Sequence, residues 1–324
     1  MRLAIVGATG LVGQTFIQII EQRDFPYDDL KLLASARSAG KKLTVKGKEY
    51  TVEELTAASF DDVDLALFSA GGEVSKKYAP IAAGHGTIVV DNSSAWREDD
   101  GIGLVVPEIN PEDAKLNKII ANPNCSTIQA VLPLFALQKV FGIKQITYTT
   151  FQAVSGAGQK GIDDLLATQK GEAPAHFPHN ISKTAIPEID VFLENGYTKE
   201  EMKMVNETRK ILHQADLEIS ATCVRVPVEN SHGVSVQVTL AKEFDLEAIG
   251  KAFEVQEGLI VADDGAHHIY PTSELSNGRD EVYIGRIRKD LARENSLLFY
   301  CTADNIRKGA ALNAVQIAEQ LLPL

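Results

Sequence analysis

Cysteines, basic clusters and long apolar runs are scarce in this 324-residue sequence, and each absence excludes a class of protein. The three cysteines, Cys125, Cys223 and Cys301, are an odd number without CxxC spacing, which argues against a disulfide framework or a zinc site and favours a reducing compartment. No apolar run reaches the ~20 residues of a membrane helix, and the N-terminal MRLAIVGATG lacks the pattern of a signal peptide. We therefore expect a cytoplasmic protein without a metal site and without a membrane segment.

The charge balance narrows the range of partners. The net charge is −12, and the basic residues are spread along the chain instead of forming a patch. This distribution argues against nucleic acid and against an anionic membrane surface. A small anionic ligand needs only a few local arginines, so we expect small-molecule partners.

Two hydrophobic patterns predict two domains. In the first third, short apolar runs alternate with helical patterns, which is typical of an α/β domain with a doubly wound, Rossmann-type parallel sheet; these runs are 3–6, 30–34, 65–69 and 88–90. After about residue 124, a helix to about Phe141 precedes longer alternating segments, which predict an α+β domain with a mixed, largely antiparallel sheet; these segments are 143–151, 218–228, 234–240, 282–289 and 297–302. We place one domain at 1–123 with a returning C-terminal helix in 305–324, and the other at 124–304.

A glycine-rich turn, GATGLVG, lies between the first predicted strand and the first predicted helix. Glycines allow the backbone there to approach a pyrophosphate, whose charge the helix N-terminus stabilises. The GxxGxxG spacing is a weaker signal than GxGxxG, but its position after the first strand supports a dinucleotide site. The predicted cofactor residues of this turn are Gly7, Thr9, Gly10, Leu11, Val12 and Gly13.

The end of the second strand predicts NADP instead of NAD. An NAD site usually carries an acid at this point for the ribose 2′-hydroxyl, whereas this sequence has Ser35, Arg37 and Ser38 and no acid. Arg37 can bind a 2′-phosphate through charge-assisted hydrogen bonds. The alternative is that Arg37 is a solvated loop residue.

Cys125 lies where a strand ends and a helix begins. A helix N-terminus favours the thiolate form of cysteine, and its free N–H groups can hold an oxyanion. Cys223 and Cys301 lie in apolar segments and have the pattern of buried structural cysteines. A thiolate beside a nicotinamide implies an aldehyde dehydrogenase that forms a thioester, with a base for the protons. His232, at the start of a predicted strand, is a candidate for that base.

Eight segments carry a resemblance that spans nearly the whole chain. They are GATGLVG near the N-terminus, FSAGG at 68–72, DNSSAWR at 91–97, NPNCST at 122–127, FQAVSGAG at 151–158, NETRKIL at 206–212, RVPVENSHG at 225–233 and DNIRKGAALNAVQIAE at 304–319. Together, and in this order, they resemble the aspartate-β-semialdehyde dehydrogenase family.

The resemblance implies the NADPH-dependent reduction of L-aspartyl-4-phosphate to aspartate semialdehyde with release of inorganic phosphate, on the route to lysine, threonine and methionine. It also implies that 1–123 with 305–324 binds NADP, that 124–304 is the catalytic and dimerisation domain, and that the protein is a homodimer or tetramer. The implied catalytic residues are Cys125 as nucleophile, His232 as acid/base catalyst and Gln152 as a positioning residue.

The same resemblance assigns the remaining site residues. The substrate carboxylate is assigned to Arg225, its ammonium to Glu207 and the phosphate to Arg97 and Lys210, with Asn124 also in the substrate site. The additional cofactor positions are Gly71, Gly72, Ser155, Gly156 and Asn305.

Two alternatives remain at this point. The N-acetyl-γ-glutamyl-phosphate reductase family shares the fold and the cysteine chemistry, but it typically has glycine before and an aromatic residue after its cysteine, whereas Asn124 and Ser126 flank Cys125 here. Its acetylated substrate also has no ammonium for Glu207 to bind. The second alternative is a non-catalytic NADP-binding sensor, which needs the glycine turn but not the cysteine and its partners.

Overall fold

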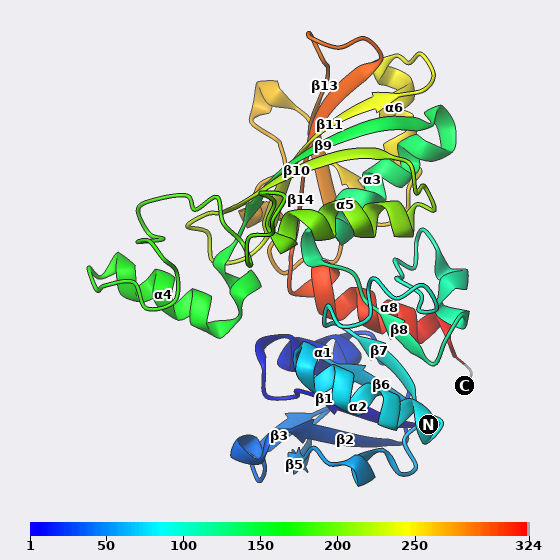
Figure 1. Cartoon of the computed structure of the whole chain (residues 1–324), viewed down its shortest axis with the longest axis vertical. Coiled ribbons are helices and arrows are strands. Elements are labelled where there is room, and N and C mark those ends of the chain that lie inside the picture. Colours follow the sequence, from blue (N-terminus) through cyan, green and yellow to red (C-terminus); the bar gives the residue numbers. More distant parts are fainter. Residues whose placement is uncertain (323–324) are drawn as a thin grey trace. The chain divides into compact units, whose positions relative to one another are not determined.

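The computed structural model describes residues 1–322, which divide into two compact units (Figure 1). Unit 1 comprises Met1–Pro123 and Ala310–Leu324, and unit 2 comprises Asn124–Gly309. The chain returns to unit 1 at Ala310, whereas the sequence-based boundary was placed at 305. Positions 323–324 of that predicted segment lie outside the described residues.

Unit 1 contains a six-stranded sheet in the order β5-β2-β1-β6-β7-β8, and every pairing in it is parallel. Its strands are β1 (Arg2–Val6), β2 (Asp29–Ala34), β5 (Glu53–Glu54), β6 (Leu65–Phe68), β7 (Ile88–Asp91) and β8 (Ile119–Ala121), and a separate hairpin consists of β3 (Lys42–Val45) and β4 (Lys48–Thr51). Its helices are α1 (Leu11–Gln22), α2 (Gly72–Gly84) and α8 (Leu312–Gln320). This arrangement confirms the predicted doubly wound sheet.

The strand order reverses between β1 and β6, which are neighbours in the sheet although β2 follows β1 in the chain. In open parallel sheets, ligands bind at the carboxyl ends of the strands where the order reverses. Apolar packing stabilises this sheet. Strand β6 is buried along its whole length, and α1 and α8 contribute Phe16, Ile19 and Val315 to one apolar cluster with β1 and β2. Apolar burial of this kind is the main favourable contribution to folding.

Unit 2 contains a mixed six-stranded sheet in the order β10-β9-β11-β14-β13-β12. The outer pairs β10–β9 and β12–β13 are parallel, and the three inner pairings are antiparallel, which confirms the predicted mixed, largely antiparallel sheet. Its strands are β9 (Ile143–Gln152), β10 (Glu218–Arg225), β11 (His232–Leu240), β12 (Leu259–Val261), β13 (Val282–Lys289) and β14 (Ser296–Ala303). Its helices are α3 (Cys125–Phe141), α4 (Gln159–Gln169), α5 (Lys199–Ile211), α6 (Leu246–Glu254) and α7 (Ser273–Ser276).

The two faces of the unit 2 sheet differ in burial. Helix α3 contacts both α5 and α6, and the three helices pack on the strands of one face, where Tyr148 of β9 and Val236 of β11 are fully buried (Figure 1). The alternate residues of the same strands point to the opposite face, as the pleat of a strand requires. We call this second face the open face, and it is formed by the partly exposed Thr147, Thr149, Phe151, Ser235, Gln237, Leu298 and Tyr300.

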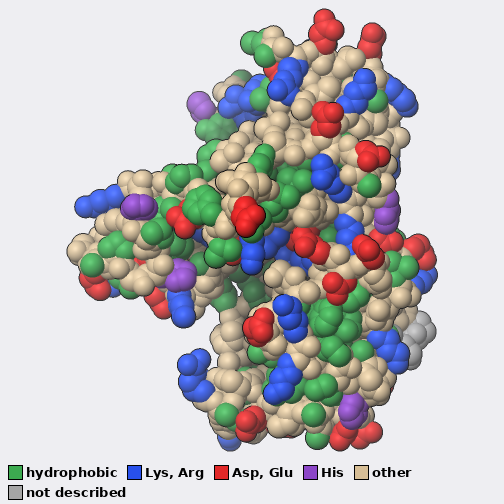
Figure 2. Space-filling view, in the orientation of Figure 1, with side chains coloured by type: hydrophobic (Ala, Val, Ile, Leu, Met, Phe, Trp, Pro, Cys, Tyr) green, Lys and Arg blue, Asp and Glu red, His purple; other side chains and the backbone are tan. Residues whose placement is uncertain are grey.

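The surface carries both signs of charge. On the face drawn in Figure 2, lysine and arginine side chains are dispersed, with aspartate and glutamate between them. Among residues 1–322, no helix is long and apolar enough to span a membrane.

Candidate active site

In unit 1, the glycine turn lies at the carboxyl end of β1, and close contacts require its glycines. A Cβ on Gly7, whose φ is +86°, would lie 2.9 Å from the carbonyl oxygen of Ser69, and a Cβ on Gly13 would lie 2.1 Å from the carbonyl oxygen of Gly7. Helix α1 starts after Gly10, with no side-chain cap and no acidic residue in its first turn. Its N-terminal N–H groups and the positive end of its dipole therefore fit a pyrophosphate.

The other predicted cofactor positions of unit 1 surround this turn. Thr9 Oγ1 donates a hydrogen bond to Ser38 Oγ at 3.3 Å, so the turn after β2 adjoins the glycine turn. Ser35 and Arg37 are exposed on that turn, and positions 34–41 contain no acid. The remaining predicted positions are Leu11 and Val12, which begin α1, and Gly71 and Gly72, which begin α2 after β6.

Arg97 is a buried cation of unit 1. Its Nε donates to the carbonyl oxygen of Asn122 at 2.9 Å, and its Nη2 donates to the carbonyl oxygen of Asn92 at 3.0 Å. These two carbonyls follow β8 and β7, so the main chain fixes the guanidinium at the carboxyl ends of these strands. Its placement within unit 1 suits the binding of an anion.

In unit 2, the half-buried Cys125 is the first residue of α3, as the sequence predicts. Asn124 caps this helix, because its Oδ1 accepts hydrogen bonds from the N–H groups of Ser126 at 2.9 Å and Thr127 at 3.4 Å. These two N–H groups are therefore engaged and do not form the oxyanion site expected from the sequence.

Two carboxylates of α5 hold Asn124 in place. Glu207 Oε2 accepts a hydrogen bond from the backbone N–H of Asn124 at 2.6 Å, while Glu200 Oε1 accepts one from its side-chain Nδ2 at 2.8 Å. Glu200 Oε1 also accepts a hydrogen bond from Gln152 Nε2 at 3.0 Å. Sequence reasoning missed Glu200, although it lies two helical turns before Glu207 and so on the same helix face.

Glu200 forms an ion pair with Lys203, another residue that the sequence analysis did not select. Lys203 Nζ lies 3.0 Å from Glu200 Oε2 and 2.9 Å from Asp190 Oδ2. Burial alone would raise the pKa of Glu200, but Lys203 and the hydrogen bonds from Asn124 and Gln152 outweigh it and lower the pKa to about 2. Glu200 is therefore ionised near neutral pH. The predicted Lys210 lies on the same helix and is partly buried.

The ends of three adjacent strands supply the other predicted residues of unit 2. Gln152 ends β9 and pairs in register with Arg225, which ends β10, while His232 begins the antiparallel β11. Arg225 Nη1 donates to the carbonyl oxygen of Ala153 at 2.7 Å, and the N–H of Ala153 donates to His232 Nδ1 at 2.9 Å. Burial and the charge of Arg225 lower the pKa of His232 to about 3.

Cys125 lies close to this group. Burial lowers the pKa of Arg225, and the negative charges of Glu200 and Cys125 partly offset that effect. The neighbouring Gly309 packs on the cysteine, because a Cβ there would lie 3.0 Å from Cys125 Cβ. Cys223 is buried, and burial raises its pKa, which fits a structural cysteine.

Ser155 and Asn305, two predicted cofactor positions, are buried and hold the chain before His232. Asn305 Oδ1 accepts a hydrogen bond from the N–H of Ser231 at 2.8 Å, and Asn305 Nδ2 donates to Ser155 Oγ at 3.0 Å. Ser231 has a φ of +74°, which costs free energy for a residue other than glycine. The third position, Gly156, is exposed beside the ring of His232.

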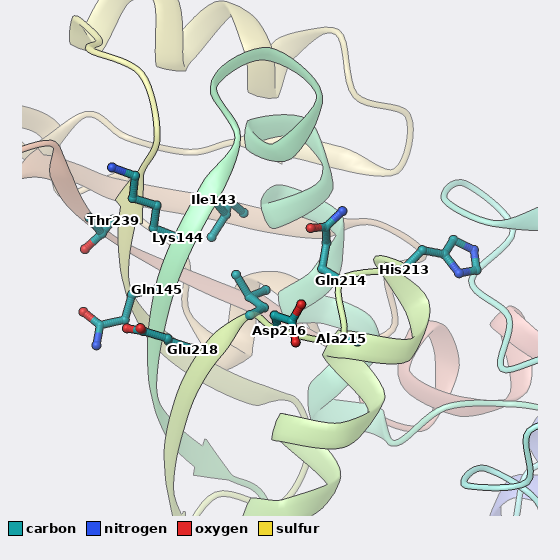
Figure 3. Close-up of a pocket in the computed structure, with 10 residues that line it drawn as sticks. Ile143, Lys144, Gln145, His213, Gln214, Ala215, Asp216, Glu218 and Thr239 are labelled. Atoms are coloured by element: carbon teal, nitrogen blue, oxygen red, sulfur yellow. The ribbon is translucent and has the colours of Figure 1, made fainter.

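A pocket of about 750 Å³ lies elsewhere in unit 2, at the opposite end of β9 and β10 from Gln152 and Arg225. Figure 3 shows Lys144, Gln145 and Glu218 at the strand ends that border it. None of the predicted site residues lines this pocket, so it is separate from the group around Cys125.

Two protein-family descriptions match the chain. Residues 2–117 match "Semialdehyde dehydrogenase, NAD binding domain", and residues 133–308 match "Semialdehyde dehydrogenase, dimerisation domain". A relative from Aquifex aeolicus, named aspartate-semialdehyde dehydrogenase, is 53% identical over 332 residues, which cover 99% of this chain and 98% of that protein. The chain belongs to the aspartate-semialdehyde dehydrogenase family.

Solved structures of the aspartate-semialdehyde dehydrogenase family agree with this assignment. The crystal structure of aspartate semialdehyde dehydrogenase II from Vibrio cholerae complexed with ASA has a TM-score of 0.95 and 44% identity, covering 99% of this chain and 98% of that chain. The aspartate semialdehyde dehydrogenase from Candida albicans with NADP has a TM-score of 0.79 and 25% identity, covering 99% of this chain and 98% of that chain. Family membership confirms the resemblance carried by the sequence segments.

Proposed function

We propose that this chain catalyses the NADPH-dependent reductive dephosphorylation of L-aspartyl-4-phosphate to L-aspartate 4-semialdehyde, in the biosynthesis of lysine, threonine and methionine. The observation that carries the proposal is the group in unit 2, where Cys125 at a helix N-terminus lies near Arg225, and Arg225 lies near His232. This activity depends on a reduced thiol, which fits the cytoplasmic location that we also propose.

Cys125 is the proposed nucleophile. Its thiolate attacks the acyl carbon, so that the S–C bond forms and the C–O bond to phosphate breaks, with phosphate leaving with the electron pair. The bound dinucleotide supplies the hydride that reduces the resulting thioester. When the hydride has added, the S–C bond breaks, the aldehyde forms and the thiolate is restored. Gln152, fixed by Glu200 and Thr150, positions the reacting group.

Arg225 is the proposed partner of the substrate carboxylate. Its planar guanidinium has five N–H donors, and the contact with the Ala153 carbonyl fixes its orientation. We propose Glu207 for the substrate ammonium and add Glu200, because Glu200 is ionised and contacts the side chains of both Asn124 and Gln152. Asn124 is proposed to contribute to the same substrate site.

The phosphate of the substrate needs cations. We propose Arg97 and Lys210 for this role, and we add Lys203 because of its ion pair with Glu200. Arginine and lysine side chains donate charge-assisted hydrogen bonds to anionic oxygens.

NADP is the proposed dinucleotide. The NAD-binding domain of the family covers 2–117, and the exposed Arg37 without a neighbouring acid favours the 2′-phosphate. The relative from Candida albicans is described with NADP. The remaining proposed cofactor residues are Gly7, Thr9, Gly10, Leu11, Val12, Gly13, Ser35, Ser38, Gly71, Gly72, Ser155, Gly156 and Asn305.

A homodimer formed through the open face is the proposed assembly. This face belongs to the dimerisation domain of the family and carries Phe151 against Tyr300, with ring centroids 6.1 Å apart. Sedimentation at micromolar concentration should give a dimer or tetramer, and Phe151→Lys should shift it toward monomer. A wild-type monomer would contradict this assembly.

The deciding experiment measures phosphate-dependent reduction of NADP+ with L-aspartate semialdehyde, and in parallel with N-acetyl-glutamate semialdehyde. We expect turnover with the first substrate alone, no turnover by Cys125→Ser, and near-normal NADP binding by that variant. Cys223→Ser is the matched control and should keep its activity. Turnover with the acetylated substrate would assign the chain to the sister activity, and no turnover with either substrate would favour a sensor.

A further inference from the structure

We propose that Phe177 is a positioning residue of the substrate site: its ring supports the guanidinium of Arg225, and the buried carboxylate of Asp164 holds the turn 175–177 that carries the ring. This inference rests on the proposed function for the ligand of Arg225, which is the substrate carboxylate. The contact between the ring and the guanidinium can be tested without turnover.

Phe177 lies in the connection that follows α4. Figure 1 shows α4 and this connection projecting from the sheet of unit 2. Residues 170–176 are exposed, whereas Phe177 is half-buried. Its side chain packs on a small apolar cluster formed by Val154, Leu165, Ile181 and Ile186. The ring is therefore directed into unit 2, while the residues before it face solvent.

Asp164 of α4 fixes the backbone of this turn. Its Oδ1 accepts a hydrogen bond from the N–H of Ala175 at 2.8 Å, and its Oδ2 accepts those of His176 at 3.2 Å and Phe177 at 2.9 Å. Burial alone would raise the pKa of Asp164, but the hydrogen bonds from these three N–H groups outweigh it and lower the pKa. Asp164 is therefore ionised near neutral pH, and three charge-assisted hydrogen bonds hold the turn on α4.

The guanidinium of Arg225 lies over the ring of Phe177, with 5.9 Å between Cζ and the ring centroid. A ring attracts a cation at this distance, and the attraction is stronger where water is excluded. Arg225 is only 5% exposed, so the contact is largely desolvated. An aromatic ring carries no net charge, so it stabilises the buried cation without neutralising it, and the positive charge remains for an anionic ligand.

The same connection also holds the main chain of Arg225. The N–H of Arg225 donates to the carbonyl oxygen of Ile186 at 2.8 Å, and the N–H of Ile186 donates to the carbonyl oxygen of Arg225 at 2.9 Å. The backbone of Arg225 and its guanidinium are therefore both held by the segment that runs from Phe177 to Ile186. Changes of length beyond Ile186 would leave these contacts in place.

This support should affect substrate affinity. Without the ring, the guanidinium is more mobile and better hydrated in the free enzyme, and this freedom and water are lost when a carboxylate binds. The α-carboxylate of the proposed substrate takes no part in the bonds that form and break at Cys125. Its binding therefore stabilises the ground state and the transition state alike. Loss of the Phe177 ring should raise KM and leave kcat nearly unchanged.

The first test measures steady-state kinetics with L-aspartate semialdehyde. Phe177→Leu should raise the KM for the semialdehyde about fivefold or more, while kcat and the KM for NADP+ stay within about twofold of wild type. Phe177→Tyr keeps the ring and should stay within about twofold of wild type in all three. Phe192→Leu, which changes a 59% exposed phenylalanine of the same connection, is the matched control. An unchanged KM in Phe177→Leu, or an equal loss in Phe177→Tyr, would overturn the proposal.

The second test needs no substrate. In the whole protein with ¹⁵N-labelled arginine, the Nε–H signal of Arg225 is assigned by its loss in Arg225→Lys. Because the guanidinium lies over the ring face, which shields nearby protons, Phe177→Leu should move this signal downfield, and Phe177→Tyr should leave it nearly in place. A signal that does not move in Phe177→Leu would show that the ring does not support Arg225. If the shift is present but the wild type reduces no semialdehyde, the proposed function fails and the support of Arg225 by Phe177 stands.

Hydrogen exchange followed by mass spectrometry tests the role of Asp164. In Asp164→Asn an amide group replaces one of the two acceptor oxygens, so the side chain no longer accepts all three hydrogen bonds. Peptides that cover 175–177 should exchange about tenfold faster or more, and the KM for the semialdehyde should rise as in Phe177→Leu. Asp163→Asn, at the adjacent exposed position of α4, is the control and should change neither. Wild-type exchange and wild-type KM in Asp164→Asn would show that Asp164 does not hold the turn.

Discussion

The main chain of Gly156 lies against the ring of His232: a Cβ built on Gly156 would be 3.1 Å from His232 Nε2 and 2.8 Å from Arg225 Nη1. Gly156→Ala should therefore displace one or both side chains and lower kcat/KM about 10- to 100-fold, since shifts near 1 Å have such effects. Gly250→Ala in α6, where a Cβ meets nothing within 4 Å, is the matched control. Unchanged steady-state kinetics for Gly156→Ala would show that the ring edge does not face the substrate.

Glu200→Gln should impair the site for two reasons. The amide N–H group of the new side chain can face the N–H donors of Asn124 and Gln152, and the substitution removes the carboxylate that forms an ion pair with Lys203. We expect a loss of about 1–3 kcal/mol in the free energy of unfolding and at least about a tenfold loss in kcat. Urea unfolding and steady-state kinetics measure these changes. Glu247→Gln, an exposed i,i+4 partner of Lys251, should change neither. Wild-type kinetics in Glu200→Gln would remove this residue from the proposed site.

Arg37→Ala should weaken the binding of NADP+ about 10- to 100-fold and change that of NAD+ by no more than about twofold, because only NADP+ carries the 2′-phosphate. Fluorescence titration with both dinucleotides measures the two affinities. Lys41→Ala, a nearby exposed cation, is the control for a general loss of positive charge. Equal weakening of both dinucleotides would mean that Arg37 does not bind the 2′-phosphate.

The stability of the protein should fall in mild acid, in part because of His232. Its folded-state pKa is lowered from 6.5 to about 3, so between these values the unfolded chain binds a proton that the folded chain does not. The contribution to stability is therefore complete above pH 6.5 and is lost as the pH falls toward 3. The slope is at most about 1.4 kcal/mol per pH unit.

Urea unfolding of the wild type and of His232→Gln near pH 7.5 and near pH 5 tests this contribution. The variant should lose less stability than the wild type over that interval. Glu200, whose pKa is lowered from 4.5 to about 2, contributes in the same direction only at more acidic pH. Identical losses in both proteins would show that His232 is not kept neutral by the fold.

The strands and the cysteine were predictable because their signals are local. The continuous apolar run of β6 predicts a strand that is buried on both faces, and the alternation in β9 predicts a strand with one buried face. The polar residues around Cys125 mark the start of α3. Gln152 and Arg225 were assigned from the resemblance, and the predicted segment 218–228 extended beyond Arg225, where β10 ends. The comparisons confirm the predicted family.

Contacts between distant segments were not predictable in this way. The α5 sequence contains the spacing E-x-x-K twice, at Glu200–Lys203 and at Glu207–Lys210, and only the packed helix shows that both carboxylates reach Asn124. The sequence also did not predict that the amide oxygen of Asn305 accepts a hydrogen bond from the N–H of Ser231. The contact of Ala153 with His232 uses a backbone N–H, for which no side-chain motif exists.

Phe151 and Gln152 are consecutive in β9, yet they belong to opposite faces of the sheet. Removal or addition of a single residue within this strand would exchange the two, so that the surface proposed to join subunits and the surface proposed to hold substrate would both be lost at once. Related chains of different length should therefore carry their insertions and deletions elsewhere. The stretch 170–198, which has no helix or strand of its own, is where such variation is expected to be tolerated.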